Sequence, residues 1–76
     1  MRIGVEVNDF FEKYGGKTGK FEMEIDPGFN VQKLLQKLNI PQDRVGFVIV
    51  NQKRVDFDYV FSEGDEVHIL PFAIGG

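Results

Sequence analysis

A chain of 76 residues that has no cysteine and one histidine leaves few chemical options open. Disulfide scaffolds and cysteine catalysis are excluded, and His68 alone cannot build a zinc site, which needs about four ligands. The formal net charge of −3 argues against nucleic acid as a partner, because such binding depends on lysine and arginine neutralising phosphates.

The hydropathy pattern gives no sign of a membrane segment. The first residues, MRIGVEVNDFF, lack the uninterrupted apolar stretch of a signal peptide. The longest apolar run, residues 45–50, is far shorter than the ~20 residues that a spanning helix needs. We therefore expect one cytoplasmic domain, residues 1–76, that contacts neither a membrane nor nucleic acid.

Two segments near the N-terminus alternate apolar and polar residues, as half-buried strands do. The apolar positions are Met1, Ile3, Val5 and Val7 in the first segment, and Phe21, Met23 and Ile25 in the second. We expect these segments to form a hairpin, with the glycine-rich stretch YGGKTG as a flexible connection.

One amphipathic helix is predicted after the DPG turn at residues 26–28. Its apolar positions have the spacing of a helix face and are Val31, Leu34, Leu35 and Leu38. Asn30 is the expected N-cap. At the other end, Asn39 suits the left-handed position, Ile40 can pack back on the helix, and Pro41 cannot continue it.

The second half of the chain predicts three more strands. Residues 46–50, GFVIV, are apolar at both parities, which predicts a central strand with apolar surroundings on both faces. The NQKR turn at 51–54 leads to a short strand around Val55, and the SEGDE turn at 62–66 leads to a last strand at 67–72.

This order of elements predicts an α+β fold of the β-grasp, or ubiquitin-like, type. A mixed sheet of four to five strands is covered on one face by one main helix. Apolar residues on the other face are then available to a partner. We select Leu70 and Phe72, with Phe47, as the interface patch; the alternative is ordinary strand packing under the segment DFFEKY.

Most other motifs have ordinary explanations. GKT at residues 16–18 lacks the preceding glycine and the following helix of a phosphate-binding loop. His68 is interpreted as a solvated histidine on an end strand, and no pair of nucleophile and base is visible. We therefore expect a protein that is not an enzyme. The acidic residues, which form either a solvated face or a docking surface for a basic enzyme, are Asp56, Asp58, Glu63, Asp65 and Glu66.

The C-terminal sequence LPFAIGG is the strongest chemical signal. Gly76 presents an α-carboxylate that is ionised at neutral pH and can attack an activated phosphate. Gly75 and Gly76 lack side chains, so they can enter a narrow site, whereas Pro71 stiffens the approach and has no N–H to extend the sheet. The alternative is a frayed terminus without function.

The terminal Gly-Gly and the EGDEVHILP segment resemble the ubiquitin-like sulfur carriers, the small subunit of molybdopterin synthase (MoaD) and the thiamine sulfur carrier ThiS. The resemblance is specific at six residues: Gly64, Asp65, Val67, Pro71, Gly75 and Gly76. It implies that an adenylating enzyme uses ATP and magnesium to activate Gly76, after which sulfur replaces AMP to give a thiocarboxylate. It implies no bound cofactor or metal in the carrier itself.

The long first connection and the segment LPFAIGG resemble the molybdopterin branch more than ThiS. This branch implies two partners, the adenylating enzyme and the large subunit of molybdopterin synthase. The expected partner-binding residues are Leu70, Pro71, Phe72, Ile74 and Phe47. Two other functions stay open: a sulfur carrier for thiamine or for tRNA thiolation, and a ubiquitin-like modifier conjugated through Gly76. A plain interaction module with an inert tail is a further alternative.

Overall fold

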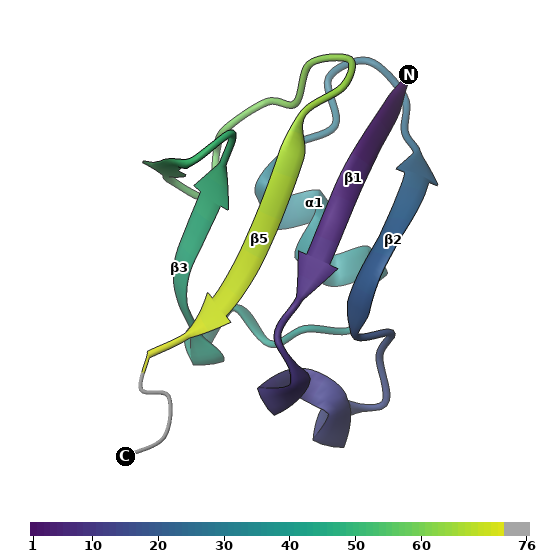
Figure 1. The fold of residues 1–76 in the computed structure, drawn as a ribbon. Coiled ribbons are helices and arrows are strands. Elements are labelled where there is room, and N and C mark those ends of the chain that lie inside the picture. The colour runs from purple at the N-terminus through teal and green to yellow at the C-terminus, as the bar shows by residue number, and fades with distance from the viewer. Residues whose placement is uncertain (73–76) are drawn as a thin grey trace.

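The computed structural model describes residues 1–72 and contains a five-stranded mixed sheet with one α-helix across one face (Figure 1). The sheet has the strand order β2-β1-β5-β3-β4, and only the β1–β5 pair is parallel. The strands are β1 (Arg2–Val7), β2 (Gly19–Glu24), β3 (Val45–Val50), β4 (Lys53–Val55) and β5 (Glu66–Pro71). The helices are α1 (Val31–Lys37) and two short 3-10 helices, η1 (Asp9–Tyr14) and η2 (Gln42–Arg44). The predicted β-grasp fold is confirmed.

The first hairpin forms as predicted, with Ile3 opposite Met23 and Val5 opposite Phe21. The chain between its strands is more ordered than the sequence pattern indicated, because residues 9–14 form η1. The Asn8 side chain accepts a hydrogen bond of 2.9 Å from the Phe10 N–H at the start of η1. Phe11 is buried in the core and fixes this helix against the sheet.

Helix α1 begins and ends where its sequence predicts. The Asn30 side chain accepts a hydrogen bond of 2.9 Å from the Lys33 N–H, which satisfies one of the free N–H groups of the first turn. Asn39 has φ 59°, and the Ile40 N–H donates to the Leu35 carbonyl over 2.9 Å. Leu35 is 1% exposed, so the apolar face of α1 lies in the core.

Strand β3 has a neighbour on each side, β5 and β4, but the middle strand of the sheet is β5. Val48 and Val50 are buried on the helix side, whereas Phe47 and Ile49 occupy the opposite face. The prediction that both faces of β3 meet apolar surroundings was therefore wrong, because α1 covers only one face of the sheet and Phe47 is 39% exposed.

The turn at Asn51 and Gln52 joins β3 to the edge strand β4. Both residues have positive φ, 51° and 72°, which is the geometry that a two-residue hairpin requires. None of the helices in residues 1–72 has the length and apolar character needed to cross a membrane.

Candidate functional site

The open face of the sheet, opposite α1, carries an apolar patch near the end of β5. Leu70 lies opposite Phe47 in the β3–β5 register, and Phe72 follows directly after β5. Leu70 is half-buried, Phe47 is 39% exposed and Phe72 is 69% exposed. We call these three residues the tail patch. With Phe72 this exposed, ordinary packing under the segment 9–14 does not account for this residue.

Pro71 does not belong to this patch. It pairs with Val45, and its side chain is buried on the helix side together with Ile69. Successive side chains in a strand point to opposite faces, so Leu70 on the open face requires Pro71 on the helix side. Its expected role as a partner-binding residue is thus not supported by the position of its side chain. Ile74, Gly75 and Gly76 lie outside the described residues.

A cation lies at the border of the tail patch. Arg54 on β4 lies opposite Ile49, and its guanidinium carbon is 4.6 Å from the centre of the Phe47 ring. A cation over an aromatic face is attracted by the negative potential of the ring. The tail patch therefore combines apolar surface with one positive charge, as partner-binding surfaces often do.

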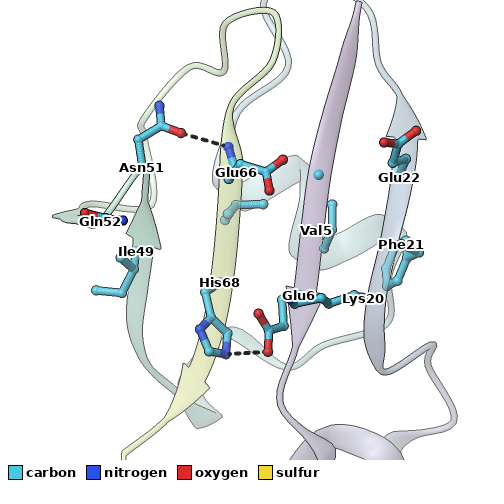
Figure 2. Close-up of a pocket in the computed structure, with 12 residues that line it drawn as sticks. Val5, Glu6, Lys20, Phe21, Glu22, Ile49, Asn51, Gln52, Glu66 and His68 are labelled. Atoms are coloured by element: carbon cyan, nitrogen blue, oxygen red, sulfur yellow. Dashed lines mark hydrogen bonds and ion pairs between the residues drawn. The ribbon is translucent and has the colours of Figure 1, made fainter.

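A groove on the same face lies beside the patch, toward the start of β5 (Figure 2). His68 lies on the middle strand of the sheet rather than on an end strand, and its Nε2 is 3.7 Å from a carboxylate oxygen of Glu6. Figure 2 also shows the Glu66 N–H donating to the Asn51 side chain over 3.0 Å. Residues 1–72 hold no group of three or more side chains that could bind a metal ion.

Asp65 differs from the other acidic residues because it is buried and 5% exposed. Its carboxylate accepts hydrogen bonds from the Asn51 side chain (2.8 Å), the Tyr59 hydroxyl (2.8 Å) and the Ser62 N–H (2.9 Å). Burial by itself raises the pKa of Asp65, but the hydrogen bonds from these three donors outweigh it and lower the pKa below its usual value. The hydrogen bond to Asp65 in turn raises the pKa of Tyr59.

The expectation of a solvated or docking role is therefore wrong for Asp65. Its carboxylate ties the β3–β4 turn to the start of β5, which is a structural role. The spacing of Ser62 and Asp65 could have indicated this structural role in the sequence. An acidic side chain three residues after a serine can accept a hydrogen bond from the serine N–H within one turn.

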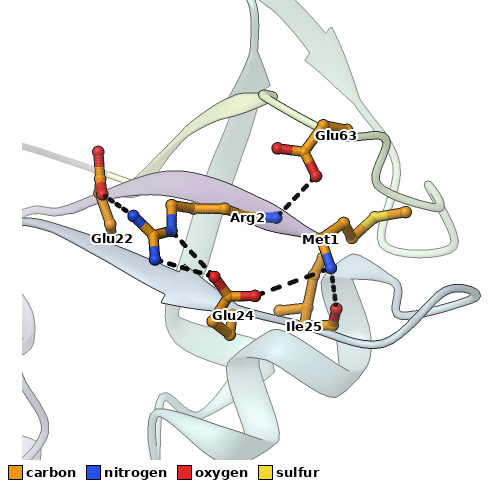
Figure 3. Close-up of polar contacts among 6 residues, drawn as sticks. All are labelled: Met1, Arg2, Glu22, Glu24, Ile25 and Glu63. Carbon is orange, nitrogen blue, oxygen red and sulfur yellow. Dashed lines mark hydrogen bonds and ion pairs between the residues drawn. The ribbon is translucent and has the colours of Figure 1, made fainter.

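The far end of the open face is charged rather than apolar (Figure 3). The Arg2 guanidinium lies 3.0 Å from Glu24 and 3.3 Å from Glu22, and the hydrogen bond to Glu24 raises the pKa of Arg2. The Arg2 backbone N–H donates to Glu63 over 3.0 Å, and the Met1 amine donates to the Ile25 carbonyl over 3.0 Å. The open face thus changes from charged to apolar toward the end of β5.

The order of strands, the single crossing helix and the uncovered face define a ubiquitin-like β-grasp protein. Several solved structures share this fold, and three of them illustrate the similarity. A molybdopterin converting factor subunit 1 from Pyrococcus furiosus has a TM-score of 0.70 and 21% identity, over 93% of this chain and 97% of that one. The small archaeal modifier protein 1 of H. volcanii has a TM-score of 0.67 and 16% identity, over 92% and 95%.

The third structure is a complex of subunits 1 and 2 of the molybdopterin-converting factor from Helicobacter pylori, with a TM-score of 0.65 and 17% identity over the full length of both chains. Residues 1–74 match the family described as Mut7-C ubiquitin, and this chain belongs to that family. The predicted resemblance to the MoaD group is confirmed at the level of the ubiquitin-like fold. No curated protein matches the sequence.

Proposed function

We propose that this protein is a sulfur carrier in molybdopterin biosynthesis and that Gly76 bears the sulfur as a thiocarboxylate. The observation that carries the proposal is the position of the tail patch. Phe72 is its most exposed member, and only three residues lie between Phe72 and Gly76. A partner that holds the patch is therefore placed next to the reactive carboxylate.

The chemistry requires two steps at the Gly76 carboxyl. In the first, a carboxylate oxygen attacks the α-phosphate of ATP bound with magnesium in an activating enzyme, and pyrophosphate leaves. In the second, sulfide attacks the carbonyl carbon of the acyl-adenylate, AMP leaves, and the thiocarboxylate remains. The carrier supplies the carboxyl group as a co-substrate, and the activating enzyme supplies the electrophile and the metal.

Two partners follow from this proposal, both in the cytoplasm: the adenylating enzyme and the large subunit of molybdopterin synthase. Support for the second partner comes from the Helicobacter pylori structure, which contains both subunits of a molybdopterin-converting factor. Phe47, Leu70 and Phe72 are the residues that we assign to these contacts. Apolar residues with aromatic anchors and a cation at the border, here Arg54, are typical of such interfaces.

The test is the intact mass of the protein after incubation with ATP, magnesium, sulfide and the adenylating enzyme of the same organism. We expect the C-terminal fragment to gain the mass difference between one sulfur and one oxygen atom. The control is a variant that lacks Gly76, in which no gain is expected. An unchanged mass with a demonstrably active enzyme would exclude the thiocarboxylate.

A second function, conjugation of Gly76 to protein lysines, is favoured by the similarity to the small archaeal modifier protein 1 of H. volcanii. The activation step is the same in both functions, so the mass experiment does not separate them. Conjugates of higher mass in the native cell, detected with an antibody and lost when Gly75 and Gly76 are deleted, would establish the modifier function. Sulfur transfer to thiamine or tRNA is tested by supplying those pathways with the thiocarboxylate form.

A further inference from the structure

Gly46 lies at an irregularity in β3, directly beside the end of β5. Val45 pairs with Pro71 and Phe47 pairs with Leu70, so two steps along β3 correspond to one step along β5. Gly46 is the extra residue of this β-bulge. Bulges bend a strand and change the direction of the side chains and backbone near them.

The backbone of residues 71 and 72 occupies the space that a side chain at Gly46 would need. A Cβ atom at position 46 would lie 2.6 Å from the Cα of Phe72, 2.7 Å from its N and 2.7 Å from the carbonyl oxygen of Pro71. Carbon atoms in contact normally stay about 3.5–4.0 Å apart. All three obstacles are backbone atoms, so no rotamer change relieves the overlap.

The need for glycine at this position is one of space and not of backbone conformation. Gly46 has no positive φ, unlike Gly64, which has φ 83° in the turn before β5. An L-residue could adopt the backbone angles at position 46, but the chain leaving β5 would have to move.

We propose that Gly46 is a positioning residue that sets the path by which the chain leaves β5 after Pro71. Its missing side chain lets the backbone of Phe72 pass close to β3 as the chain leaves β5. The same path sets the starting point of the residues that end in Gly76. The effect of Gly46 on sulfur transfer rests on the proposed function, whereas its effect on Phe72 does not.

The variant Gly46→Ala tests this role. Relieving the overlap requires a displacement of about 1 Å at Phe72, from the observed 2.6 Å to normal contact. A misplacement of about 1 Å at a reacting group can cost up to about 100-fold in rate. We expect kcat for thiocarboxylate formation to fall about 10- to 100-fold, with a smaller change in KM because Phe47 and Leu70 stay in place.

Gly4→Ala is the matched control, because it is the same substitution in another strand of the sheet. There the new methyl group would meet the carboxylate of Glu66, which is the far end of a flexible side chain and can move away. We expect kcat and KM of Gly4→Ala to equal those of the unmodified protein within about twofold. Equal losses in both variants would show a general effect of strand substitution and would overturn the role of Gly46.

A lengthened tail distinguishes positioning from destabilisation. One glycine inserted after Phe72 adds about 3.3–3.6 Å of reach. We expect this insertion to restore part of the rate of Gly46→Ala and to slow the unmodified protein. A loss that comes only from a weakened fold would not be restored in this way, so failure of the insertion to raise the rate would contradict the proposal.

The structural part is tested on the unmodified protein by NMR. We expect a nuclear Overhauser effect between the α-protons of Gly46 and the amide or α-proton of Phe72, and its absence would overturn the proposal even if Gly46→Ala does not fold. If the unmodified protein forms no thiocarboxylate, the proposed function fails, while the same cross-peak still decides whether Gly46 positions Phe72. An active protein whose Gly46→Ala variant keeps full kcat would leave the proposed function intact and reject the role of Gly46.

Discussion

The two ends of β5 differ. At its start, the buried carboxylate of Asp65 accepts three hydrogen bonds. At its end, the backbone of Phe72 packs against Gly46, and the Phe72 side chain is exposed. The Gly4 N–H also donates to the Asp65 carbonyl over 2.9 Å, so the start of β5 is tied to β1 and to the β3–β4 turn. The end carries exposed apolar surface at Phe47 and Phe72.

Residues of one sequence motif therefore serve separate purposes at the two ends of β5. Gly64 and Asp65 are needed to build the turn and to satisfy buried donors, so their role is stability. Leu70 and Phe72 leave apolar area in water, which contributes little to the fold and is available to a partner. Substitutions at the two ends should therefore affect different measurements.

Asp65→Ala is expected to have the largest effect on the fold. It leaves the Tyr59 hydroxyl, the Asn51 amide and the Ser62 N–H without their acceptor, at about 1–3 kcal/mol for each donor that stays buried. We expect the free energy of unfolding in urea to fall by about 2–4 kcal/mol. Tyr59→Phe, which removes one donor and keeps the ring, should cost about 1 kcal/mol. A loss of less than 1 kcal/mol in Asp65→Ala would contradict the structural role.

Leu70→Asp is expected to change binding more than it changes the stability of the fold, because Leu70 is half-buried. A charge at the centre of the tail patch opposes its burial by a partner, and residues at interface centres commonly contribute 2 kcal/mol or more. We expect affinity for the adenylating enzyme, measured by calorimetry, to fall by about 10- to 100-fold. Lys20→Asp, on the edge strand β2 opposite Glu6, is the control. Unchanged affinity in Leu70→Asp would remove the tail patch from the interface.

Acid should weaken the start of β5 selectively. The pKa of Asp65 is lowered in the folded protein, so its carboxylate stabilises the fold above the unfolded pKa of about 3.9, and this contribution is lost as the pH falls through the folded pKa. We expect the difference in unfolding free energy between the unmodified protein and Asp65→Asn to be largest above about pH 5 and to shrink toward pH 2. A difference that is independent of pH would contradict the hydrogen-bonded carboxylate.

Arg54→Gln, at the border of the tail patch, is expected to have the smallest effect on the free energy of unfolding. It removes the cation 4.6 Å from the Phe47 ring and keeps a side chain of similar reach. Exposed cation–π contacts contribute about 0.5–1 kcal/mol, so the unfolding free energy should fall by no more than that. The proton shifts of the Phe47 ring provide a direct measurement, and unchanged shifts would show that the guanidinium does not rest on the ring in solution.

The elements with a strong local period could be predicted from the sequence. Three apolar positions of α1 and its C-cap residue Leu38 repeat at helical spacing between Asn30 and Asn39, so both ends and the buried face were defined locally. The hairpin of β1 and β2 followed from alternation. The connection between these strands was not predicted to form η1. The adjacent apolar residues Phe10 and Phe11 match neither the two-residue period of a strand nor the 3.6-residue period of an α-helix.

Features that depend on distant pairing could not be predicted. Alternation in the last strand does not reveal that it lies between β1 and β3, and therefore which of its faces is covered. Pro71 was assigned to the partner-binding residues because it is close to the tail, but its parity with Ile69 places it in the core. Asp65 was expected at the surface because a charged residue in a turn usually is, and its three donors come from separate segments.

The central position of β5 has a mechanical consequence if the chain acts through its end, as we propose. The strand pairs with β1 on one side over residues 66–69 and with β3 on the other side over residues 67–71. A partner that pulls on the residues after Phe72 loads both ladders along the strand axis, so their hydrogen bonds share the force instead of opening one after another. The tail can therefore be drawn into a tight site while the body resists being unravelled.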